Sequence, residues 1–166
     1  MKHRMIATLI ASLLFSLPLF SLPGWAATDA ASGFASLKNL AGQWESKDEK
    51  GNPAITSWKL VSGGSALMEE MPHESMVTMY HLDNQRLLMT HYCSAMNQPR
   101  MQAEISPDGK TITFNFVDAT NVAKPTDGHM QKMILTMQDQ DHFAEKWVFS
   151  GEGKEHTMSF QYTRKQ

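Results

Sequence analysis

Hydrophobic and polar residues alternate along most of the chain from Trp44 onward, which is the pattern of β-strands that bury one face. The alternation is clearest in three segments, each with one apolar, largely aromatic face: Ile112, Phe114 and Phe116; Phe143, Trp147 and Phe149; and Met158, Phe160 and Tyr162. The chain is therefore predicted to be all-β over this region.

Turn sequences separate the alternating segments every 8 to 12 residues: DEKGN, VSGGS, MPHE, LDNQ, MNQP, SPDGK, the longer DATNVAKPTDG, QDQD and GEGK. Nine turns delimit ten strands, and their shortness predicts antiparallel neighbours. We expect an up-and-down antiparallel barrel, because closure removes the exposed edges of an open sheet. A two-sheet sandwich is the alternative, but it is typical of chains with longer crossover connections.

One short helix is predicted before the first strand. Phe34, Leu37 and Leu40 are spaced three apart, which suits a helix that lies on a core and closes one end of the barrel. Ser32 is a candidate N-cap, and Gly42 is a candidate stop. The barrel domain is assigned to residues 36–166 and a linker to residues 27–35.

The first 26 residues have the order of a secretory signal peptide. Lys2 and Arg4 precede an apolar run, and the small residues of PGWAATDAA follow it. The alternative is an uncleaved membrane anchor, but Pro18 and Pro23 disfavour a spanning helix. We expect cleavage after Ala26, a periplasmic or secreted mature protein, and no membrane association after cleavage.

Charge and cysteine content narrow the possible partners. Removal of Lys2 and Arg4 from 15 basic residues leaves 13 against 17 acidic ones, a net charge of −4. Lys and Arg do not cluster, so nucleic acid is not an expected partner. Cys93 is the single cysteine, which excludes an internal disulfide, and it lies too far from the cleavage site to carry a lipid anchor.

The hairpin around LDNQ places a histidine and the cysteine on one face. With Asp83 and Asn84 as the central turn residues, Leu82 pairs with Gln85. Residues that pair across strands share a face. The face predicted to point into the barrel then contains Met76, Thr78, Tyr80, Leu87, Met89, His91 and Cys93, because the opposite face carries His81 and Arg86.

Three interpretations of this inward face remain open. Its residues can be ordinary core filling. They can line a pocket for an apolar or amphipathic small molecule, with Thr78, Tyr80 and His91 as polar anchors. They can form a soft-metal site for Cu(I), to which Met68, Met71 and His73 add ligands.

An enzyme is a further alternative. Cys93 with His91 suggests a thiolate–imidazole pair, although neighbours two apart on a strand lie side by side and no third orienting residue is evident. Glu145 shares a face with Phe143 and Trp147, and burial there would raise its pKa and suit it to acid–base chemistry. Asn97 and Arg100, in the polar NQPR loop, are candidates for ligand contacts at the barrel mouth; the alternative is that this loop is only a turn around Pro99.

Two short motifs give the chain a family resemblance. LAGQW contains a Gly-x-Trp that follows a helix, and FQYTRKQ ends the chain. Together with ten strands they resemble the calycin group: lipocalins, fatty-acid-binding proteins and nitrobindin-like haem barrels. The resemblance implies that Gly42, Trp44 and Arg164 close the barrel bottom, with the tryptophan packed under the basic residue of the last strand. Residues 76–101 also resemble a block found in secreted bacterial proteins of this shape.

The chain departs from the nitrobindin-like proteins at its last strand, where His156 lies at a different spacing from the terminal basic residue than their iron-binding histidine. No cofactor and no metal ligand set are assigned. The sequence therefore predicts an exported binding protein that holds an apolar or amphipathic small molecule in a barrel lumen, with no complete set of catalytic residues.

Overall fold

The computed structural model describes residues 29–47, 51–124 and 126–166. The predicted signal peptide, residues 1–26, lies outside the described residues. The elements are α1 (Ala30–Lys38), β1 (Gly42–Lys47), β2 (Pro53–Val61), η1 (Ser62–Gly64), β3 (Ala66–Met71), β4 (Met76–Asp83), β5 (Arg86–Tyr92), β6 (Gln98–Ile105), β7 (Thr111–Thr120), β8 (His129–Met137), β9 (His142–Gly151) and β10 (Lys154–Arg164). No helix among these residues is both long and apolar enough to cross a membrane.

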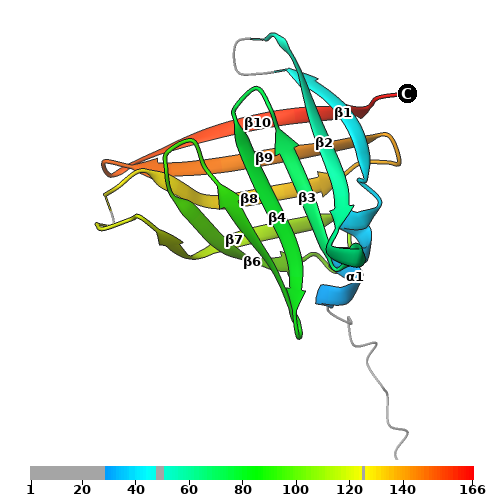
Figure 1. The fold of residues 1–166 in the computed structure, drawn as a ribbon, viewed down its shortest axis with the longest axis horizontal. Helices are drawn as coiled ribbons and strands as arrows, with labels where there is room; N and C mark the ends of the chain where they lie inside the picture. Colours follow the sequence, from blue (N-terminus) through cyan, green and yellow to red (C-terminus); the bar gives the residue numbers. More distant parts are fainter. Residues whose placement is uncertain (1–28, 48–50, 125) are drawn as a thin grey trace, which may run out of the picture.

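The ten strands form one closed antiparallel barrel, as Figure 1 shows. Each strand pairs with the next along the chain, and β1 closes the barrel by pairing with β10 through Trp44 opposite Arg164. The predicted fold class is confirmed. The short turns explain the order, because they connect only strands that are neighbours in the sheet.

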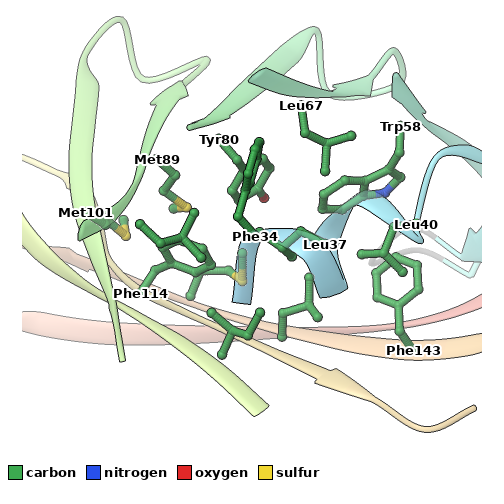
Figure 2. Packing of buried hydrophobic residues seen from close by; sticks show 14 of the residues in the cluster. Phe34, Leu37, Leu40, Trp58, Leu67, Tyr80, Met89, Met101, Phe114 and Phe143 are labelled. Carbon is green, nitrogen blue, oxygen red and sulfur yellow. The ribbon is translucent and has the colours of Figure 1, made fainter. Parts of the chain in front are cut away.

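The alternating residues point into one continuous core. Phe114, Phe143 and Trp147 are buried, while their sequence neighbours are less so. Trp58 stacks on Tyr80 with ring centroids 5.2 Å apart. Figure 2 shows this core, with Phe34, Leu37 and Leu40 below Tyr80, Leu67 and Trp58. Side chains therefore fill the helix-covered part of the barrel.

Helix α1 begins earlier than the predicted cap. The Asp29 carboxylate accepts the Ser32 backbone N–H at 2.7 Å, so Asp29 is the N-cap and residues 30–35, expected in the linker, are helical. The helix ends at Lys38 with Asn39 as its C-cap. Gly42 does not end the helix, contrary to the prediction. It opens β1 with φ +136°, where a side chain would be strained and would approach Arg164 Nη1.

The β4–β5 hairpin has a different register from the predicted one. Asp83 pairs with Arg86, so Asn84 and Gln85 are the central turn residues, and Thr78 lies opposite His91. Asn84 has φ 55°, a conformation that asparagine tolerates, and Asp83 forms an ion pair with Arg86. The pairing is shifted by two residues. An even shift keeps every side chain on its predicted face.

Trp44 and Arg164 close the helix-covered end of the barrel. Trp44 is fully buried, its Nε1 donates to the Leu40 carbonyl at 2.7 Å, and the Arg164 guanidinium lies 4.2 Å from its ring centroid. Arg164 Nη2 also donates to the carbonyls of Asn39 (2.9 Å) and Gln140 (3.1 Å). One side chain thus joins the end of α1 to the β8–β9 turn.

Candidate functional site

A cavity of about 300 Å³ lies inside the barrel near the end opposite α1. Leu87, at the start of β5, lies beside Gly33 of α1, whereas His91, near the end of β5, lines the cavity. The wall is mostly apolar and includes four methionines from four strands. The lining residues are Ser46, Ala54, Thr56, Met71, His73, Glu74, Met76, His91, Met130, Trp147, Met158, Phe160 and Tyr162.

His91 is the most deeply placed imidazole of this wall. It is 1% exposed, its Nδ1 lies 2.9 Å from Thr78 Oγ1, and its ring centroid lies 4.7 Å from that of Trp147. Burial lowers the pKa of His91 to about 4, so the ring is neutral at pH 7. Its Nε2 atom is buried and has no hydrogen-bond partner. A buried polar atom without a partner is costly.

Two buried carboxyl groups face one another across the barrel, Glu69 from β3 and Glu145 from β9. Glu69 Oε2 accepts the Tyr80 hydroxyl at 2.7 Å, and Glu145 Oε2 accepts Trp147 Nε1 at 3.0 Å and the Tyr162 hydroxyl at 3.3 Å. The two carboxyl groups lie close enough for the charge of Glu145 to raise the pKa of Glu69. Two buried carboxyl groups at such a separation do not readily ionise together.

Burial raises the pKa of both glutamates. It raises the pKa of Glu145 to about 7, and burial together with the Glu145 charge raises the pKa of Glu69 well above its ordinary value. The two groups titrate as a pair. Near neutral pH the pair therefore holds at least one proton.

Thr78 lies between this carboxyl pair and His91. Its Oγ1 is 2.9 Å from His91 Nδ1, and its interaction with the Glu69 carboxyl group counteracts the rise in the pKa of that group. The unpartnered Nε2 of His91 is the ring atom left to hydrogen-bond with a ligand.

The carboxyl pair lies directly behind the cavity wall. Trp147 and Tyr162 both line the cavity, and both donate to Glu145. The site thus consists of a small apolar chamber, one unpartnered imidazole nitrogen at its surface, and a buried carboxyl pair one side chain further in.

The structure brings four of the sequence-predicted ligand residues to this site. Met76 and His91 line the cavity, and Thr78 and Glu145 form the network behind it. Tyr80 and Met89 also point inward, but they are packed in the core, where Tyr80 contacts Trp58 and Phe114.

Three further predicted residues, Arg100, Asn97 and Cys93, also do not line the cavity. Arg100 faces outward and pairs with Asp118 of β7, because the alternation of β6 turns Pro99 and Met101 inward. Asn97 is buried in the β5–β6 turn, where its Nδ2 donates to the Gly128 carbonyl at 2.8 Å. Cys93 is half-buried in the same turn, and His91 is engaged by Thr78 and Trp147 rather than by Cys93.

Sequence reasoning missed Glu69. Its signal was present, because the alternation Leu67, Glu69, Met71 places an acidic residue on the inward face of β3. It also missed Trp147 and Tyr162 as cavity walls. Their aromatic alternation identified them only as core.

The described residues hold no group of three or more His, Cys, Asp and Glu side chains placed to bind a metal ion. The soft metal donors that line the cavity are the thioether sulfurs of methionine. Met71, Met76, Met130 and Met158 line the cavity.

No family model and no curated protein matches the chain. Among solved structures, the crystal structure of Rv2717c from M. tuberculosis is similar, with 14% sequence identity and a TM-score of 0.49. The match covers 81% of this chain and 98% of that chain.

Proposed function

We propose that the protein is an exported, calycin-type barrel that binds a small amphipathic molecule in the cavity beside His91. The observation that carries this proposal is the buried Nε2 of His91, which lines a mostly apolar cavity and has no hydrogen-bond partner. Small-molecule sites combine apolar walls with a few such polar groups. A molecule with an apolar body and one hydrogen-bonding group, such as a hydroxyl, would satisfy both features.

The size of the cavity limits the ligand. A volume of about 300 Å³ is at the lower end of the range for small-molecule sites, which extends to about 1,000 Å³. A long fatty acyl chain is therefore not the expected ligand. A compact molecule, such as a single aromatic ring with a short polar arm, matches the space.

Export is part of the proposal and rests on the first 26 residues of the sequence. We expect N-terminal sequencing of the protein from the producing cell to begin at Ala27, in material that osmotic release brings into solution. A chain that retains Met1 in the membrane fraction would overturn it.

Replacement of His91 by Leu is expected to weaken binding of 2-phenylethanol, a compact amphipathic probe. The leucine leaves the apolar walls in place but removes the imidazole nitrogen to which the probe's hydroxyl would hydrogen-bond. The loss of one hydrogen bond corresponds to about a fivefold rise in Kd. Isothermal titration calorimetry measures Kd, and thermal unfolding monitors folding of the variant.

Toluene, which has no hydroxyl, is the matched control and should bind both proteins equally well. Binding of neither probe to the wild-type protein would show that these residues are core filling. Uptake of Cu(I) that is lost in both His91→Leu and Cys93→Ser, with no binding of either probe, would instead identify a soft-metal protein.

A further inference from the structure

We infer that the ligand of this cavity is a cation, a protonated amine whose charge is attracted by the carboxyl pair behind Trp147 and Tyr162. This inference rests on the proposed function and specifies its ligand class. It derives from three features of the site: the unpartnered carboxyl oxygens, the aromatic side chains of the cavity wall, and the lack of a buried lysine or arginine beside the pair among the described residues.

The carboxyl pair behind the cavity wall has acceptor atoms that no protein donor satisfies. Glu69 Oε1 and Glu145 Oε1 are both buried without a hydrogen-bond partner. A positively charged ligand in the adjacent cavity therefore meets an electrostatic demand that a neutral ligand or a carboxylate ligand does not.

The walls also favour a positive charge. Trp147, Tyr162 and Phe160 present aromatic rings to the cavity, and ring faces attract cations. Trp147 and Tyr162 in addition direct their polar hydrogens away from the cavity, toward Glu145 Oε2. The negative carboxyl pair is thus separated from a bound cation by only one side chain.

No protein cation neutralises the pair within the described part of the chain. The buried polar and charged side chains there are Thr56, Glu69, Thr78, His91, Asn97, His129 and Glu145, without any lysine or arginine. The titratable groups around the pair are Tyr80, Tyr162 and the neutral His91, with His73 and Glu74 at the cavity mouth. A bound ammonium would supply the missing charge.

Cation binding should release a proton from the pair. Near pH 7 the pair is close to losing its proton, and an ammonium stabilises the ionised form. Affinity for the cation should therefore rise from about pH 6 to about pH 8, whereas affinity for a neutral molecule stays constant. An alkylammonium, with a pKa of about 10, remains charged over this range.

The test compares phenethylammonium with 2-phenylethanol, which differ in charge but scarcely in size. Titration calorimetry on the wild-type protein at about pH 8 should give an ammonium Kd on the order of tenfold below that of the alcohol. Glu145→Gln should abolish most of this preference, so that the ratio of the two Kd values approaches one. Glu104→Gln, which removes an exposed carboxylate on β6, is the matched control and should change neither Kd.

The wild-type pH series tests the inference even if Glu145→Gln does not fold. An ammonium Kd that falls with rising pH, with proton release into the buffer, supports it. Equal or weaker binding of the ammonium, with the alcohol still bound, overturns the cation inference and leaves the proposed function standing. Binding of neither probe overturns both.

Discussion

Replacement of Trp44 by Ala is expected to lower the free energy of unfolding by about 3 to 5 kcal/mol, the usual range for removal of a buried aromatic side chain. Trp44 is fully buried and packs edge-on against Phe143 with ring centroids 4.7 Å apart. Its loss also removes the ring below the Arg164 guanidinium and the hydrogen bond to Leu40. Urea unfolding measures the effect.

Tyr92→Ala is the matched control, because Tyr92 is a large side chain on β5 that is half exposed. This change should alter the unfolding free energy by no more than about 0.5 kcal/mol. A Trp44→Ala variant as stable as Tyr92→Ala would contradict the closure of the barrel by Trp44 and Arg164.

Glu145→Gln is expected to become more stable relative to the wild type by about 3 kcal/mol as the pH rises from about 4.5 to about 8. Burial raises the pKa of Glu145 from 4.5 to about 7, so between these values the folded protein holds a proton that the unfolded chain has released. The stability conferred by the neutral carboxyl group is complete below pH 4.5 and is lost as the pH rises through about 7. Glutamine cannot ionise and avoids this loss.

In the wild-type protein, His91 contributes to the free energy of unfolding with the opposite pH dependence. Burial lowers its pKa from 6.5 to about 4, so its contribution is complete above pH 6.5 and is lost as the pH falls. The measured quantity is therefore the difference between the unfolding free energies of Glu145→Gln and the wild type at each pH. Both proteins retain His91, so its contribution cancels. A difference that does not vary with pH would show that Glu145 ionises with an ordinary pKa and would contradict the effect of its burial.

The barrel could be predicted because its signals are local. Alternation in segments such as Ile112 to Phe116, and a turn after each segment, define strands and their antiparallel order without knowledge of distant contacts. The face of His91 was predicted although the hairpin register was wrong, because the error was an even number of residues and side chains repeat every two.

The carboxyl pair could not be predicted in the same way. Glu69 and Glu145 lie on β3 and β9, which are not neighbours in the sheet, so only the geometry of barrel closure brings them together across the lumen. Arg100 was assigned to the mouth because it belongs to NQPR, which was interpreted as a polar loop. Its outward direction depends on the position of Pro99 within β6, which turn signals do not define.

Native mass spectrometry of the protein isolated from the producing cell tests ligand binding most directly. We predict a species heavier than the apo chain by the mass of one compact organic molecule, present in the wild-type protein and reduced in His91→Leu. The cavity beside His91 limits that mass to a molecule of about 300 Å³ or less. A wild-type protein that carries no organic molecule and also binds neither 2-phenylethanol nor phenethylammonium would contradict the account.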